Sequence, residues 1–274
     1  LVTKRKIVKD HWNDPDLVFE KVLGERVTGS YDSSLMVTST GDSIRISGNP
    51  SKFNRLDNVF GYQNIQQSIH EVYNPILERL GLPPFDLDRK NPDLWKDGRD
   101  GLVWIGATLT RVDLTKNYAL GDNDQVIPFI QFLGTRDDRM KVHLFPYSRT
   151  VEWGGKASSG GRGTKYVYRK VYDKAFELDR EMARLYKKGV NISESNWEYL
   201  ERLLMWLDGK GVIRFEVELK SRYLTQKGMQ KPWIADKFKE ESYRHYSDRV
   251  LDFEGLEIGK MNDIFDKLVG VELG

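Results

Sequence analysis

The chain has 274 residues, and 43 Lys and Arg against 41 Asp and Glu leave a formal net charge of +2. Its 39% hydrophobic residues suffice for a core, which excludes disorder of the whole chain. No apolar run is long enough for a membrane span, and no signal peptide is predicted. Zero cysteines exclude disulfides and thiol catalysis, and the four histidines are scattered. Any metal is therefore expected to be held mainly by carboxylates, which favours Mg²⁺ or Mn²⁺.

Two patterned segments open the chain. Residues 31–48 form short β-favouring runs around Gly41 and Asp42, which predicts a hairpin. From Tyr62 to Leu80 the apolar residues recur every three or four positions, which predicts an amphipathic helix with a kink at Pro75.

The middle of the chain combines a strand and a short helix. Residues 101–114 are rich in β-branched and aromatic residues and predict a central strand that ends in Arg111-Val112-Asp113. Residues 124–133 predict a helix capped by Asn123 or Asp124.

A glycine-rich stretch at 154–164 is expected to be a flexible loop. It precedes a predicted strand at 165–171 and a helix at about 173–188. Ser193 is expected to cap a second helix, at 194–207, which carries an apolar stripe.

The last clear pattern is a strict alternation from Val212 to Leu224. It predicts a strand with one apolar and one charged face. The remainder, from Pro232, is expected to be helical and amphipathic.

Together these elements predict an α+β fold with a mostly antiparallel central sheet flanked by helices. No repeat or shift of composition marks a boundary, so we expect a single domain over residues 1–274. Within it we expect an N-terminal extension (1–30), a main region (31–250) and a C-terminal helix (251–274).

The charged face of the strand at 212–220 presents Arg214, Glu216, Glu218 and Lys220 in a row. Such a row is suited to a metal and phosphate site. An edge strand with cross-strand ion pairs would give the same pattern, so both interpretations stay open.

Asp113 is a second candidate, because a carboxylate at the end of a hydrophobic strand can reach into a cleft at the edge of the sheet. It lies two residues after Arg111, so the two side chains share a face. An Asp at a strand end is also a common turn or cap residue.

Basic residues and tyrosines alternate in the third candidate segment. Residues 156–174 contain six basic residues and one acid. This pattern is typical of a surface that binds a phosphate backbone and stacks unpaired bases. A solvated basic strand would look the same. The residues expected to bind DNA are Lys156, Arg162, Lys165, Arg169, Lys170, Arg214, Lys220 and Arg222.

Four motifs occur in an order and approximate spacing that resemble the filamentous-bacteriophage gene II replication proteins. They are Asn58-Val-Phe-Gly61, Arg111-Val-Asp113, Tyr172-Asp-Lys-Ala-Phe-Glu-Leu178 and Val212-Ile-Arg-Phe-Glu-Val-Glu-Leu-Lys-Ser-Arg-Tyr-Leu224. The resemblance covers roughly residues 31–250, and the last motif is the most specific.

The resemblance implies a rolling-circle replication initiator of the host cytoplasm that nicks one strand of supercoiled origin DNA. Carried over by motif, Tyr172 is the nucleophile and Lys174 assists it, and the flanking positive charge is expected to favour a phenolate. Asp113 and Glu216 would share one Mg²⁺ or Mn²⁺ ion, with Glu218 as a further ligand. The products would be a 5′-phosphotyrosine and a free 3′-hydroxyl, with a host helicase or polymerase as a further partner.

Two questions stay open at this point. Thr164-x-x-x-Tyr168-x-Lys170 fits the same local pattern, so Tyr168 is an alternative nucleophile. The run Glu216-x-Glu218-x-Lys220 with an upstream Asp113 also suits a hydrolytic metal-dependent nuclease, and a non-enzymatic DNA-binding protein is a third possibility.

Overall fold

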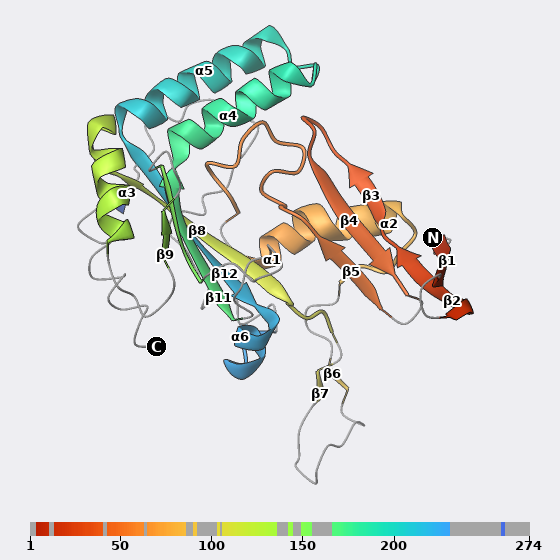
Figure 1. The fold of residues 1–274 in the computed structure, drawn as a ribbon. Coiled ribbons are helices and arrows are strands. Elements are labelled where there is room, and N and C mark those ends of the chain that lie inside the picture. The colour runs from red at the N-terminus through yellow and green to blue at the C-terminus, as the bar shows by residue number, and fades with distance from the viewer. Residues whose placement is uncertain are drawn as a thin grey trace. The chain divides into compact units, whose positions relative to one another are not determined.

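The computed structural model describes residues 4–10, 14–40, 43–62, 65–85, 90–91, 103–104, 106–135, 142–144, 149–154, 166–230 and 259–260 (Figure 1). The chain divides into two compact units, one formed by Leu1–Asn58 with Ser68–Phe85 and the other by Val59–Gln67 with Asp86–Gly274. The single domain expected from the sequence stays a prediction. In the described part of the chain, no helix has the length and apolar character that crossing a membrane requires.

The first unit contains two small antiparallel sheets. A two-stranded sheet pairs β1 (Lys4–Asp10) with β2 (Asp14–Leu23). A three-stranded sheet has the order β3-β4-β5, with β3 at Glu25–Thr28, β4 at Ser34–Ser39 and β5 at Ile44–Ser47. The predicted hairpin is the β4–β5 pair and is confirmed, while β1 and β2 lie in the segment expected to be an extension.

The helix predicted between Tyr62 and Leu80 is present, and it is irregular. It consists of α1 (Ile65–Ser68), a π-helical turn (Ile69–Tyr73) and α2 (Asn74–Arg79). The N–H of Asn74 donates to the carbonyl of Ile69, five residues back. Pro75 follows directly and has no N–H to continue the ladder, so the π-helical turn lies beside the proline, while the expected kink itself stays a prediction.

The second unit is built on a six-stranded sheet with the order β13-β8-β12-β11-β10-β9. All neighbouring strands are antiparallel except β13 and β8. Its strands are β8 (Arg111–Ala119), β9 (Val142–Leu144), β10 (Thr150–Trp153), β11 (Val167–Asp173), β12 (Val212–Lys220) and β13 (Gly259–Lys260). A separate two-stranded pair joins β6 (Lys90–Asn91) and β7 (Val103–Trp104). The sheets and helices confirm the α+β class.

The strand predicted at residues 101–114 is placed wrongly. In the structure β8 begins at Arg111 and runs to Ala119, so Asp113 lies near the start of a central strand. In the sequence, the charged pair Arg111 and Asp113 suggests that an apolar strand ends there. In the structure both residues lie on one face of β8, whose other face carries Val112 and Leu114.

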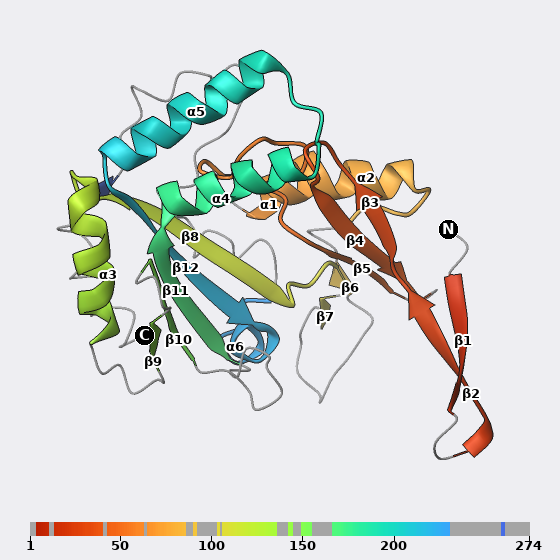
Figure 2. The same cartoon turned by 45° about the horizontal axis from the view of Figure 1, so that its top comes forward.

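The sheet has an apolar face that is covered by α3 (Val126–Gly134). This helix packs against the sheet in one cluster of buried side chains: Tyr118, Val126, Phe129, Ile130, Leu133, Val151, Trp153, Val171 and Ile213. Figure 2 shows α3 beside the sheet, while α4 and α5 lie at the end of β11. A 3₁₀ turn (Asn123–Gln125) precedes α3, and its cap is Asp122, whose Oδ1 accepts from Asp124 N at 3.0 Å. The predicted caps, Asn123 and Asp124, lie one and two residues too late.

A helical hairpin joins β11 to β12, as the sequence predicts. Asp173 caps α4 (Lys174–Lys187), and Ser193 caps α5 (Glu194–Gly209) by accepting from Asn196 N. The predicted strand at 212–224 ends at Lys220, because α6 (Ser221–Gln226) follows at once. The glycine-rich loop beyond Gly154 and most of the segment from Pro232, where a helix is expected, lie outside the described residues. The two described residues of that segment, Gly259–Lys260, form β13 and not a helix.

Gly211 makes the turn from α5 into β12 and allows a close approach of two backbones. Its φ is +57°, and a Cβ there would lie 2.2 Å from the carbonyl oxygen of Asp122. Gly189, between α4 and α5, has a similar φ of +63°, but a Cβ would meet nothing within 4 Å. Substitution of Gly189 would therefore cause backbone strain alone, whereas substitution of Gly211 would cause both strain and steric overlap.

We predict that Gly211→Ala lowers the free energy of unfolding by about 2–4 kcal/mol, because left-handed strain and overpacking add. Gly189→Ala should cost about 1–2 kcal/mol from strain alone. Urea denaturation followed by circular dichroism measures both. Equal losses would show that the Asp122 backbone moves aside without cost.

Candidate functional site

One face of the central sheet is polar, in contrast to the face under α3. Strand register places Arg214 opposite Asn117 and Tyr172, Glu216 opposite Thr115 and Lys170, and Glu218 opposite Asp113 and Tyr168. These nine residues, from three neighbouring strands, are called the polar face below. The strand alternation predicted for residues 212–220 is therefore confirmed, and it brings Tyr172, Tyr168, Asp113, Glu216 and Glu218 to the same side of the sheet.

The strand that carries the acidic pair is central in the sheet. β12 lies between β8 and β11, so the alternative of an edge strand is wrong. The cross-strand ion pairs of that alternative are nevertheless present, between Lys170 and Glu216 and between Arg111 and Glu218. Where a charged side chain of a central strand is buried, as Arg214 and Glu218 are, its charge must be neutralised by neighbouring groups.

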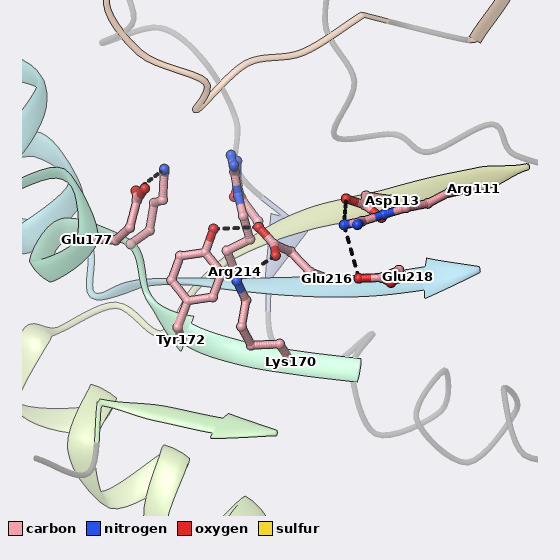
Figure 3. Close-up of polar contacts among 10 residues, drawn as sticks. Arg111, Asp113, Lys170, Tyr172, Glu177, Arg214, Glu216 and Glu218 are labelled. Atoms are coloured by element: carbon pink, nitrogen blue, oxygen red, sulfur yellow. Dashed lines mark hydrogen bonds and ion pairs between the residues drawn. The ribbon is translucent and has the colours of Figure 1, made fainter. Parts of the chain in front are cut away.

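Tyr172, Glu216 and Lys170 form a hydrogen-bonded group (Figure 3). The Tyr172 hydroxyl donates to Glu216 Oε1 at 2.6 Å, and Lys170 Nζ lies 2.7 Å from Glu216 Oε2. Lys170 Nζ also lies 4.4 Å from the centre of the Tyr172 ring. The carboxylate of Glu216 is thus shared between a phenol and an ammonium group.

Burial and neighbouring charges set the protonation of this group. Burial raises the pKa of Tyr172 well above 10, Glu216 and Glu177 raise it further, and Arg214 opposes them. Burial alone would raise the pKa of Glu216, but Lys170, the Tyr172 hydrogen bond and Arg214 lower it below 4.5. The positive charge near Tyr172 therefore does not produce the phenolate expected from the sequence. The resting pair is a neutral phenol donating to a carboxylate.

Arg111, Asp113 and Glu218 form a second group further along the same face (Figure 3). Arg111 Nε and Nη2 donate to the two carboxylate oxygens of Asp113 at 2.9 and 2.7 Å, and Nη2 lies 3.0 Å from Glu218 Oε2. The hydrogen bonds with Asp113 raise the pKa of Arg111. One cation thus holds two carboxylates together. Lys220 Nζ lies 3.5 Å from the other Glu218 oxygen.

The residues expected to bind metal do not all meet at one point. Among the described residues, no group of three or more His, Cys, Asp or Glu side chains is arranged to hold an ion. Asp113 faces Glu218 directly, whereas Glu216 faces Thr115 and is engaged by Tyr172 and Lys170. Asp113 and Glu218 are therefore the two carboxylates that lie directly opposite each other, and Glu216 lies diagonally from Asp113. The metal site expected at Asp113 and Glu216 stays a prediction.

The first turn of α4 adjoins Tyr172. Asp173 Oδ1 accepts from Phe176 N at 3.0 Å, and its other carboxylate oxygen is ion-paired with Arg149. Lys174 is almost fully buried and forms an ion pair with Glu177. The assisting role expected of Lys174 rests on its place beside Tyr172 in the sequence, but its recorded ion pair is with Glu177.

The remaining predicted residues differ in their surroundings. Tyr168 is buried opposite Glu218, and Arg169 lies on the other face of β11 from Lys170. Arg222 is exposed on α6. Lys156, Arg162 and Lys165 lie outside the described residues.

Arg214 is buried and held by hydrogen bonds to two neighbours. Its Nε donates to Asn117 Oδ1 at 2.7 Å, and its Nη2 donates to the carbonyl of Val59 at 2.9 Å. Asn117 Nδ2 donates to the same carbonyl at 2.8 Å. Only 2% of Arg214 is exposed, so its recorded contacts are internal and a DNA contact would require them to break.

Sequence reasoning misses three residues of the site. Asn117 has a detectable signal, because Arg111, Asp113, Thr115 and Asn117 alternate as polar residues along β8. Arg111 stands out in the sequence only as a neighbour of Asp113, although it bridges both carboxylates. Arg149 has no signal, because its partner Asp173 is 24 positions away.

We predict that Arg214→Met lowers the free energy of unfolding by about 2–4 kcal/mol, because Asn117 and the Val59 carbonyl lose a buried donor. The control Arg184→Met removes a partly exposed ion pair with Glu181 on the same helix and should cost under about 1 kcal/mol. Urea denaturation compares the two. A stable Arg214→Met protein whose DNA affinity falls would instead identify Arg214 as a phosphate contact.

The comparisons with known proteins agree with the motifs. Residues 12–246 match a family model that describes the N-terminal part of a phage replication-associated protein, the gene 2 protein. A relative, the replication-associated gene 2 protein of Escherichia phage If1, is 32% identical over 203 residues, which cover 73% of this chain and 61% of that protein. No solved structure matches the chain significantly. The family model extends over most of the chain, and the chain belongs to the family of phage replication-associated gene 2 proteins.

Proposed function

We propose that this chain carries the DNA-nicking activity of a phage replication initiator and that Tyr172 is its nucleophile. The phenolic oxygen attacks a phosphodiester of a single-stranded segment, forms a 5′-phosphotyrosine and releases a 3′-hydroxyl. The phosphotyrosine bond conserves the energy of the broken phosphodiester bond, so that the strand can later be rejoined. The free 3′ end can prime a host polymerase. We expect the reaction in the cytoplasm of the bacterial host, on origin DNA.

The observation that carries the proposal is the hydrogen bond from the Tyr172 hydroxyl to Glu216 on the polar face. A tyrosine in a structural role is more often packed by its ring, with the hydroxyl toward water or a backbone carbonyl. Here the hydroxyl donates to the ionised carboxylate of Glu216. A pair of carboxylates, Asp113 and Glu218, lies further along the same face. The arrangement supports a nucleophile better than it supports a hydrolytic site, in which Glu216 would be directed at metal or water.

Tyr172 is preferred to Tyr168 because Glu177 and Leu178 complete its motif and because its hydroxyl donates to Glu216. Tyr168 lies four residues earlier on the same strand, opposite Glu218, which is engaged by Arg111 and Lys220. Both rings are buried, so DNA must displace neighbouring side chains to reach either hydroxyl.

A divalent cation suits the pair Asp113 and Glu218. A single guanidinium already holds both carboxylates, and Mg²⁺ commonly uses one or two carboxylates and completes its shell with phosphate and water. When bound, the ion would withdraw charge from the non-bridging phosphate oxygens. Arg111 would then be released toward the same anion, where a forked guanidinium binds well.

We predict that Tyr172→Phe abolishes the covalent adduct, because it removes the attacking oxygen and keeps the ring. The matched control Tyr168→Phe, also buried and on the same strand, should form the adduct at a near wild-type rate. The substrate is a pool of single-stranded oligonucleotides with randomised centres, incubated with Mg²⁺. Adducts are recovered under denaturing conditions and the modified residue is mapped by mass spectrometry.

The same assay identifies the alternatives. If Tyr168→Phe loses the adduct and Tyr172→Phe keeps it, the nucleophile is Tyr168. If the wild-type protein cleaves the pool without any adduct, the mechanism is hydrolytic. If it neither cleaves nor forms an adduct, the proposed function is wrong.

We predict that Asp113→Asn weakens Mn²⁺ binding at least about tenfold and slows adduct formation by about 100-fold or more, because one of two ligands is lost. Asp208→Asn, an exposed position at the end of α5, is the control and should behave as wild type. Electron paramagnetic resonance measures bound Mn²⁺ in the presence of the oligonucleotide pool. Unchanged Mn²⁺ binding in Asp113→Asn would remove this residue from the cation site.

A further inference from the structure

Glu216 is an acidic residue whose carboxylate accepts a hydrogen bond from the proposed nucleophile, Tyr172. We propose that Glu216 is the general base of the reaction, which accepts the phenolic proton of Tyr172 as the oxygen attacks phosphorus, and that it is not a metal ligand. This assignment rests on the proposed function and concerns how that site is activated. It replaces the role of metal ligand that the sequence motif implied for Glu216.

The geometry meets the requirement for a proton acceptor. A general base must lie within hydrogen-bonding reach of the proton that it removes, and Glu216 Oε1 lies 2.6 Å from the Tyr172 hydroxyl oxygen. Both residues sit on neighbouring strands, with Glu216 opposite Lys170 and Arg214 opposite Tyr172. The sheet therefore fixes the distance between acceptor and donor before DNA arrives.

The second oxygen of Glu216 explains why a metal ion is not expected there. Lys170 Nζ lies 2.7 Å from Oε2 and its side chain is only 23% exposed, so a divalent cation at that oxygen would have to displace a largely buried ammonium group. The Arg111 side chain at Asp113 and Glu218 is 51% exposed and is more readily exchanged. Lys170 also lies over the Tyr172 ring. It thus acts as a positioning residue, which orients the carboxylate so that Oε1 is left for the phenol.

Other acids near Tyr172 are less suited to the role. Glu177 is ion-paired with Lys174 on α4, and Glu218 is bonded to Arg111 and lies opposite Tyr168. Among the described residues, the carboxylate with a recorded hydrogen bond to the Tyr172 hydroxyl is that of Glu216.

The step balances in atoms and charge. The Tyr172 oxygen forms a bond to phosphorus while its proton moves to Glu216 Oε1, and the bond from phosphorus to the 3′ oxygen breaks. The leaving 3′ oxygen takes a proton from water, and Glu216 later returns its proton to the hydroxide so formed. In rejoining the same steps run backwards, so the protonated carboxyl supplies the proton that the departing Tyr172 oxygen needs.

The experiment measures single-turnover adduct formation with saturating oligonucleotide from the pool recovered with the wild-type protein. Glu216→Gln keeps an acceptor oxygen for the Tyr172 hydroxyl but cannot take its proton, so the rate should fall at least about 100-fold. Glu216→Asp keeps a retracted carboxylate and should be intermediate. The matched control is Glu152→Gln. Glu152 lies on β10, opposite Lys170 of β11, and this variant should react as wild type.

Two further measurements separate a base from a ligand or a structural residue. Added formate should restore the rate of Glu216→Ala several-fold in a concentration-dependent way, because it can enter the vacated space and accept the proton, whereas chloride should not. Raising Mg²⁺ or Mn²⁺ should leave Glu216→Gln slow. Thermal melting and oligonucleotide affinity are measured for each variant, so that a folding defect is recognised. If a variant is destabilised, the response of Glu216→Ala to formate still tests whether Glu216 is the base.

The outcomes are distinct from those for the proposed function. If the wild-type protein forms the Tyr172 adduct but Glu216→Gln reacts within about tenfold of it, only the assignment of Glu216 is overturned. Recovery of Glu216→Gln at high metal concentration, or no response of Glu216→Ala to formate, also overturns it. If the wild-type protein forms no tyrosine adduct, the proposed function itself fails.

Discussion

The polar face depends on one constraint, which is that charges on a central strand must be neutralised by the strands on either side. β12 has neighbours on both edges, so Arg214, Glu216 and Glu218 find their partners on β8, on β11 and in the segment at Val59. Each ion pair or hydrogen bond across the face also fixes strand register. The arrangement that stabilises the sheet is thus the same one that places a phenol against a carboxylate.

This constraint divides the face into regions with different properties. At one end, Arg214 is buried in a network with Asn117 and the Val59 carbonyl, which is suited to holding structure. At the other end, about half of the Arg111 side chain is exposed, and it bridges Asp113 and Glu218 through contacts that an incoming anion or cation can exchange. Glu216 lies between them, and Tyr172 lies opposite Arg214. A site for phosphoryl transfer needs preorganised charged groups, and the fixed Arg214 network and the exposed Arg111 group would supply them to the proposed site.

The sequence predicts the alternation of β12, the helix that Ser193 caps, and the shared face of Tyr168 and Tyr172, because these follow from local periodicity and capping chemistry. It does not predict which carboxylates meet. Asp113 and Glu218 are separated by about a hundred positions, and a shift of two residues in register would have placed Glu216 opposite Asp113 instead. The start of β8 is also misplaced when Arg111 and Asp113 are interpreted as the end of an apolar strand, since they begin a two-faced one.

The strand order has a consequence for biosynthesis. β12 is later in the chain than β8 to β11, yet it lies between β8 and β11. A nascent chain that has not yet emerged from the ribosome as far as Lys220 therefore has unpaired edges on β8 and β11 where β12 will lie. The charged side chains on those edges also lack their partners on β12. Completion of the sheet has to wait for long-range pairing across about a hundred residues, which slows folding. The proposed catalytic carboxylate arrives on the same strand that closes the sheet, so a truncated product would lack both the complete sheet and the proposed general base.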